Sequence, residues 1–157
     1  MKRSVKWILT VSFVLVGLCV LYVFVGQEYV YAKKYANELL EFQIPDKTKV
    51  IEEDFDYGVI YGGGPWGNGG YPTLVVYQRI LTELSQKEIF EHYNRKDFEI
   101  YFEGDEVLKK NNKNQIWYEG VMKDKDTLDT QKNTDHAMEA IIQYRTEFSY
   151  PLFIDLY

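Results

Sequence analysis

The stretch Tyr71–Glu83, YPTLVVYQRILTE, is rich in Val, Tyr, Ile and Thr, which are the residues that fit best on the pleated surface of a β-strand. A run of glycines precedes it and a helix-start signal follows it, so both of its ends are marked. We expect a strand at these residues, and the elements on either side of it predict the rest of the fold.

A short helix is predicted directly after this strand. Ser85 and Glu88 match a capping box, in which the serine oxygen accepts from the third helical amide and the glutamate accepts from the serine amide. Ile89, Phe90 and Tyr93 then give the helix an apolar face. We expect this face to pack on the sheet.

Three further strands are predicted toward the C-terminus. Residues 98–104 and 114–122 alternate between apolar and polar side chains and are joined through the polar turn region NNKN. Residues 137–148 favour a strand by alternation, although the run HAMEAI near their start also suits a helix. The polar stretch 123–136 is expected to be a solvated loop.

A strand and a helix are predicted on the N-terminal side. Ile51 and Phe55 share one parity, interrupted only by Glu53, and acidic residues hold the other parity, which is typical of a half-buried strand. Residues 27–42 carry apolar side chains at helical spacing and follow the preceding segment without a helix breaker. We therefore expect an amphipathic helix that Pro45 ends.

The N-terminal segment Trp7–Gly26 contains twenty residues without a charge. At about 1.5 Å per residue, a helix of this length spans roughly 30 Å, the thickness of a bilayer's hydrocarbon core. Three basic residues precede it, and an excess of basic residues marks the cytoplasmic side. We expect residues 1–26 to form a cytoplasmic stub and transmembrane anchor, and residues 27–157 to form a domain outside the cell.

Two alternatives for this segment stay open. A signal peptide cleaved near Ala32 would release the domain, although the apolar run is longer than the usual 7–15 residues or so. Cys19, in the run LVGLC, resembles the lipid-bearing cysteine of a bacterial lipoprotein, but Leu18 is bulkier than that pattern requires. The uncleaved anchor is the preferred interpretation.

The order of the elements predicts an α+β fold. It consists of a transmembrane helix that continues into an amphipathic helix, followed by an antiparallel sheet of about five strands with one helix packed on it.

The charge of the chain limits its partners. The net charge is −6, and residues 1–26 hold three of the 18 basic groups and no acidic group, which leaves 15 basic and 24 acidic side chains, a net charge of −9, on the remainder. Such a domain repels nucleic acid, which binds through neutralised phosphates. The single cysteine lies in the apolar segment, so the domain holds no disulfide.

A glycine-rich stretch lies between the first two predicted strands. Gly62 to Gly67 satisfies G-x-G-x-x-G, the pattern of a dinucleotide-binding turn. That turn must open a helix, whereas here a strand follows, and Pro65 removes an amide from the supposed cradle. We expect no cofactor at this stretch.

Two interpretations of the same stretch remain. In the first, it joins two antiparallel strands and Trp66 folds back onto the sheet. In the second, Trp66 forms an exposed aromatic platform with Tyr61 and Tyr71, which stacks on a sugar or grips a protein. The structural interpretation is preferred, because most tryptophans are largely buried.

We assign no metal or catalytic residues from the sequence. The acidic run beginning at Asp54 places Gly58 at the wrong position for an EF-hand loop. His92 and His136 are the only histidines, and no cysteine lies outside the apolar segment, which argues against zinc.

The layout of a basic start, one apolar span and a small cysteine-free α+β domain resembles the uncharacterised single-pass extracytoplasmic proteins of Gram-positive bacteria, as does the helix run LSQKEIFEHY. Our leading hypothesis is a membrane-tethered, non-enzymatic binding or accessory domain that faces the cell envelope and engages an envelope protein or glycan. The alternatives are an immunity-type or regulatory partner of another membrane protein, and an envelope glycan-processing enzyme.

Overall fold

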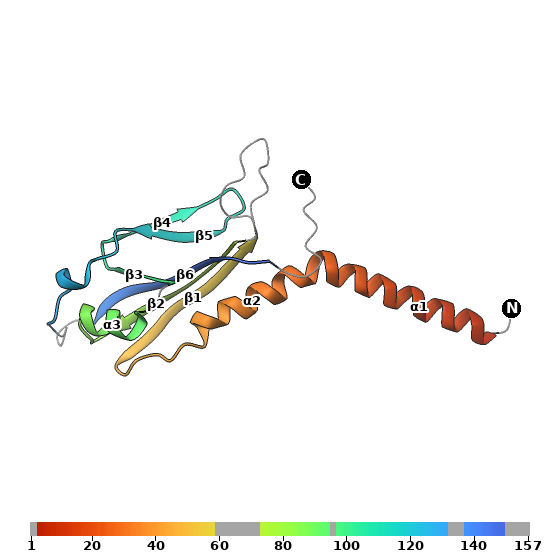
Figure 1. The fold of residues 1–157 in the computed structure, drawn as a ribbon, viewed down its shortest axis with the longest axis horizontal. Helices are drawn as coiled ribbons and strands as arrows, with labels where there is room; N and C mark the ends of the chain where they lie inside the picture. The colour runs from red at the N-terminus through yellow and green to blue at the C-terminus, as the bar shows by residue number, and fades with distance from the viewer. Residues whose placement is uncertain (1–2, 59–72, 95–96, 132–136, 150–157) are drawn as a thin grey trace.

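The computed structural model describes residues 3–58, 73–94, 97–131 and 137–149, and these residues form an α+β fold (Figure 1). The predicted α+β class is confirmed. In chain order the elements are α1 (Arg3–Leu21), a π-helical turn (Tyr22–Gly26), α2 (Gln27–Leu40), β1 (Thr48–Gly58), β2 (Thr73–Thr82), α3 (Gln86–Tyr93), β3 (Phe98–Phe102), β4 (Glu106–Lys110), β5 (Ile116–Gly120), a short 3-10 turn (Lys125–Thr127) and β6 (Met138–Glu147).

The main sheet has four strands in the order β1-β2-β6-β3, and all of its neighbours are antiparallel. β2 pairs along its full length with β6, from Thr73 opposite Glu147 to Thr82 opposite Met138. The predicted strand at this stretch is confirmed, and nearly every residue of β2 is buried. Residues 137–148, for which the sequence suits either a strand or a helix, form the strand β6.

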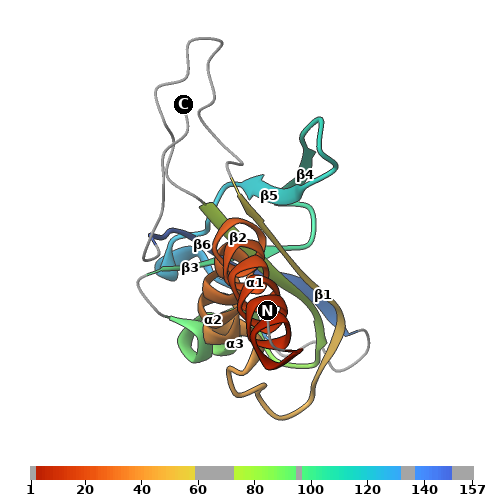
Figure 2. The ribbon, with the colours of Figure 1, turned by 90° about the vertical axis from the view of Figure 1, so that its right-hand side faces the viewer.

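Two helices cover one face of this sheet, which we call the inner face, whereas one packed helix was predicted (Figures 1 and 2). Ala32, Ala36 and Leu39 of α2 are fully buried against it, and the two alanines let the helix approach the strands closely. Ile89 and Tyr93 of α3 complete the layer. The amphipathic helix therefore belongs to the core of the domain.

The predicted capping box of α3 is confirmed. The Ser85 hydroxyl accepts from the Glu88 amide at 3.3 Å, and the Ser85 amide donates to the Glu88 carboxylate at 3.0 Å. Each contact satisfies an amide that the first turn of a helix leaves without an intrahelical partner.

The predicted sheet of about five strands is wrong. β4 and β5 form a separate two-stranded hairpin that lies over the other face of the main sheet, the outer face (Figures 1 and 2). The turn region NNKN joins β4 to β5, with Asn114 at a positive φ of 66°. The sequence gives no strand signal at β4, because Val107 and Leu108 are adjacent and both faces of this strand are exposed.

A β-bulge alters the predicted faces of β1. The register with β2 shifts between Val50 and Glu52, so Val50 packs on the core while Ile51 is exposed. After the bulge, Glu53 lies on the same inner-facing side as Phe55, opposite Gln78 of β2. Glu53, which interrupts the apolar pattern of this strand, therefore places a charged side chain on the inner face.

The predicted transmembrane anchor is corrected by the structure. Among the helices in the described part of the chain, none is both long enough and apolar enough to cross a membrane. The uncharged run is divided, because α1 ends at Leu21 and the next five residues form the π-helical turn. Localisation as a single-pass membrane protein is thus not supported.

The alternative of cleavage near Ala32 conflicts with the packing of α2. Ala32 lies inside this helix and is fully buried in the core. Cleavage there would cut through a helix that covers the inner face and would remove the part of it that precedes the cleavage point.

Candidate binding site

The predicted aromatic platform of Tyr61, Trp66 and Tyr71 lies outside the described residues. The strands on either side of the glycine-rich stretch are paired, since Gly58 at the end of β1 lies opposite Thr73 at the start of β2. Gly58 has a positive φ of 111°, a conformation that suits glycine. The stretch therefore joins two antiparallel strands, as expected, while the position of Trp66 stays a prediction.

A groove beside the edge strand β1 is the first candidate site. It has a volume of about 440 Å³ and lies between the segment that follows α2 and the start of β1. Apolar side chains come from Leu40, Ile44, Val50 and Ile51, and polar ones come from Glu52, Glu53 and Gln78. We call it the Glu53–Gln78 groove.

Gln78 is an unusual residue for this position. It is 1% exposed and stands on the inner face of β2, in line with Val76 and Ile80 of the core. Its side-chain nitrogen donates to the Glu53 carboxylate at 3.0 Å. Its side-chain oxygen, Oε1, is buried and has no hydrogen-bond partner among the residues described.

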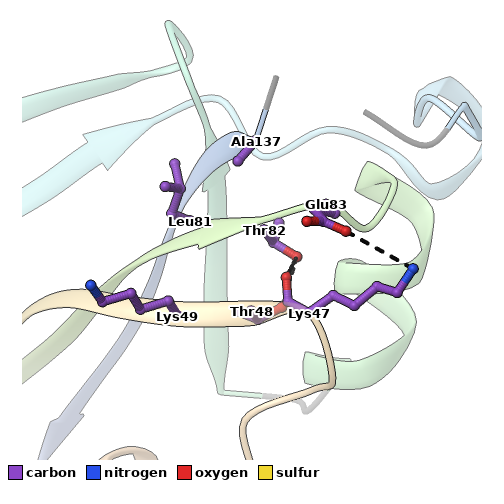
Figure 3. Close-up of a pocket in the computed structure, with 7 residues that line it drawn as sticks. All are labelled: Lys47, Thr48, Lys49, Leu81, Thr82, Glu83 and Ala137. Carbon is purple, nitrogen blue, oxygen red and sulfur yellow. Dashed lines mark hydrogen bonds and ion pairs between the residues drawn. The ribbon is translucent and has the colours of Figure 1, made fainter. Parts of the chain in front are cut away.

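A second hollow, of about 310 Å³, lies where β1 begins and β2 ends (Figure 3). The Thr48 and Thr82 hydroxyls share a hydrogen bond of 2.7 Å at its floor, and Lys47 lies 3.9 Å from Glu83. Figure 3 shows Lys47 reaching toward Glu83 while Lys49 extends the opposite way. The two lysines therefore do not converge on one anion.

The outer face carries a row of ion pairs. Arg79 of β2 contacts Glu52 of β1 at 2.6 Å and donates from Nε to Glu139 of β6 at 2.9 Å. Tyr77 donates its hydroxyl to Glu52 at 3.0 Å. Hydrogen bonds from Arg79, and then from Tyr77, hold the pKa of Glu52 below its ordinary value. These charges stabilise one another, and Glu52 is kept ionised.

The hairpin β4–β5 is fixed to the outer face through a buried glutamine. Gln143 of β6 is 0% exposed, and its side-chain oxygen accepts from the Tyr118 amide at 2.8 Å while its nitrogen donates to the Tyr118 carbonyl at 2.9 Å. The same nitrogen donates to Glu99 at 2.6 Å. The amide thus pairs with the backbone of β5 as another strand would.

Glu28 is a carboxylate whose environment favours the neutral form. Burial raises its pKa, and Lys113 opposes this shift. It lies at the start of α2 near Gly58 and lines neither hollow described above. Across the described ranges, no group of three or more His, Cys, Asp or Glu side chains is placed to hold a metal ion.

Sequence reasoning did not identify Gln78 or pair it with Glu53. The available signal was a polar residue on the apolar parity of each of two successive strands, Glu53 beside Phe55 and Gln78 beside Val76. Comparison with known proteins adds no guide to this site: neither a family model, a curated protein nor a solved structure matches the chain.

Proposed function

We propose that the chain is a non-enzymatic binding or accessory protein whose helix α1 packs against an apolar helix of a partner protein. One observation carries the proposal: the apolar side chains of α1 are exposed along its length, with Trp7 67% and Phe13 81% exposed. Figure 1 shows α1 extending away from the sheet. Contiguous exposed apolar surfaces of this kind are typical of interaction sites.

A helix is the partner that suits this surface. Large aliphatic side chains at successive turns form ridges and grooves that another helix fills. At Gly17, no side chain and no other element lies within 4 Å of the position that a Cβ would occupy, so a second helix has room to approach the backbone. The π-helical turn then joins this element to α2, which is part of the domain core.

The outer face supports a structural role for its charges. Arg79, Glu52 and Glu139 satisfy one another, and a carboxylate with a lowered pKa is poorly suited to donate a proton. A glycan-processing enzyme uses one carboxylic acid kept neutral near a second carboxylate, and these ion-paired groups do not offer that arrangement.

Photocrosslinking tests the proposal. A photoreactive residue is placed at each position from 7 to 21 of the full chain in its native cell, with Val107 of β4, which is 56% exposed, as the control position. We expect adducts to one protein, strong at every third or fourth position of α1 and absent at Val107. Substitution of Phe13→Lys should remove them, whereas Val107→Lys should not. Adducts only to lipid, or protein adducts without helical periodicity, would contradict the proposal.

A further inference from the structure

The hairpin β4–β5 buries little of its own surface. Of the ten residues in its two strands, one is buried, Tyr118, and every residue of β4 after Glu106 is exposed. A two-stranded hairpin needs further strands or a packed apolar face before it is stable in water. The hairpin therefore depends on its attachment to the outer face.

Tyr118 is the centre of this attachment. Its backbone amide and carbonyl pair with the buried side chain of Gln143, and its ring packs on Tyr77 with 5.2 Å between the ring centroids. Nearer the turn of the hairpin, the Ile116 amide donates to the Asp56 carboxylate at 2.9 Å. These contacts all come from β5, a strand of five residues, so the attached surface is small.

The base of the hairpin is held together by contacts of its own. The Lys123 ammonium, after β5, lies 3.0 Å from the Asp105 carboxylate, before β4, and the Val121 amide donates to the Asp105 carbonyl at 3.4 Å. The connection from β3 to β4 is three residues long and contains Gly104, which has a positive φ of 87°. The two strands are thus joined where they meet the rest of the domain, which favours their movement as one unit.

The surface beneath the hairpin is a patch of tyrosine rings, which we call the tyrosine patch. With the residue that covers it, the patch forms a second buried cluster, separate from the core on the inner face and made of Tyr77, Tyr101, Tyr118 and Ile141. The Tyr77 hydroxyl donates to Glu52 of β1 at 3.0 Å. The Tyr101 hydroxyl likewise donates to Glu99 of β3 at 2.9 Å. Both carboxylates belong to the main sheet, so these hydrogen bonds do not depend on the hairpin.

We propose that the hairpin β4–β5 is a lid that opens as one unit about its base at Asp105 and Lys123, while the four-stranded sheet stays folded, and that it thereby controls access to the tyrosine patch. Proteins open locally where few apolar groups are buried and much of the backbone is exposed, as in this hairpin. β2 and β6 are the opposite case, because they pair along their full length in the centre of the sheet. The lid is separate from α1 and does not depend on the function proposed for that helix.

Hydrogen exchange of the full chain, followed by NMR, tests the lid directly. The hydrogen-bonded amides of β4 and β5 should all be slowed by one common factor relative to an unstructured peptide, because one opening exposes them together. They should exchange about 100-fold or more faster than the amides of β2 and β6. Exchange of the hairpin amides at the slow rates of β2 and β6 would mean that the hairpin opens only when the whole domain unfolds, which would overturn the proposal.

Thiol labelling reports on the surface beneath the lid. Ile141 belongs to the cluster under the hairpin, its neighbour Ile142 belongs to the core on the inner face, and both are almost fully buried. Each is replaced by cysteine in a full chain that carries Cys19→Ser, because Cys19 is free and exposed, and the rate of reaction with iodoacetamide is measured. We expect Ile141→Cys to react about tenfold or more faster than Ile142→Cys. Equal rates would contradict an opening that leaves the main sheet folded.

Two substitutions separate opening of the lid from unfolding of the domain. Ser85→Ala removes the cap of α3, which stays folded when the lid is open, so it should leave the labelling of Ile141→Cys unchanged and speed that of Ile142→Cys about fivefold. Gln143→Leu removes a contact that exists only when the lid is closed, so it should speed the labelling of Ile141→Cys about tenfold or more. An equal effect of Ser85→Ala on both cysteines would overturn the proposal.

Discussion

Gln78 and Gln143 are the same residue type, equally buried, on neighbouring strands of one sheet, yet they face opposite sides of it. On the outer face, both polar atoms of Gln143 are satisfied by β5 and Glu99. On the inner face, only the nitrogen of Gln78 has a partner among the described residues. The difference teaches that burial alone does not show whether the polar atoms of an amide are satisfied, whereas its hydrogen bonds do.

The largest expected effect is that of Gln143→Leu. This change leaves the Tyr118 amide and carbonyl beneath the hairpin without partners, and each unsatisfied buried group costs about 1–3 kcal/mol. We expect a loss of about 3 kcal/mol in the free energy of unfolding, measured by urea denaturation of the full chain.

Gln78→Leu is the matched control, because it removes an unsatisfied acceptor rather than creating one. Its unfolding free energy should stay within about 1 kcal/mol of the parent or rise. If both leucine variants lose the same stability, the contrast between the two glutamines is wrong.

A smaller effect is expected from Arg79→Met on the outer face. The methionine keeps part of the packing but leaves Glu52 and Glu139 without their shared cation. Because the Arg79 side chain is 33% exposed, solvent screens the pairs, and the loss should be about 1 kcal/mol. The measurement is the urea midpoint at low and at high salt, and a loss that does not shrink in high salt would argue against an electrostatic origin.

The smallest expected effect is that of Tyr93→Phe on the inner face. The Tyr93 hydroxyl is buried without a hydrogen-bond partner in the described part of the chain, so its removal should stabilise the protein by about 0.5 kcal/mol at neutral pH. Thermal denaturation of parent and variant gives the comparison. A clear loss of stability would show that the hydroxyl has a partner after all.

The difference in stability between the parent and Tyr93→Phe should also depend on pH. Burial raises the pKa of Tyr93 to about 12 from an ordinary value of 10.0, so the folded state holds this proton more tightly than the unfolded state. The corresponding stability is fully present below pH 10 and is lost as the pH rises toward 12. Tyr93→Phe should therefore lose less stability than the parent over this range.

The parts of the fold that local signals determine were predictable from the sequence. The composition of Thr73–Thr82 and the capping box at Ser85 each depend on residues close together in the chain, and both predictions are confirmed. The strand predicted at residues 114–122 contains β5, but its place in a separate hairpin with β4 was missed, because the attachment of this hairpin depends on Gln143, which follows Tyr118 by 25 residues. No local pattern contains that contact.

The candidate site was hidden for a related reason. Glu53 was visible as an interruption of the apolar parity of β1, but its pairing with Gln78 depends on a bulge between Val50 and Glu52 that the sequence does not mark. Conversely, the twenty-residue uncharged run predicted one continuous transmembrane helix. Its composition carries no signal for the π-helical turn at Tyr22–Gly26.

That turn, Tyr22–Gly26, is a place where the chain can lose one residue without a change to the core. A π-helical turn holds one more residue than an α-helical one, and each residue of an α-helix rotates the chain by about 100° while advancing it by about 1.5 Å. Loss of a single codon here would therefore spin α1 about its axis and leave its reach almost unchanged. The packing of α2 would be undisturbed, because Ala32, Ala36 and Leu39 all follow the turn. One deletion in this turn would therefore turn another side of α1 toward its surroundings, while the core of the domain stays the same.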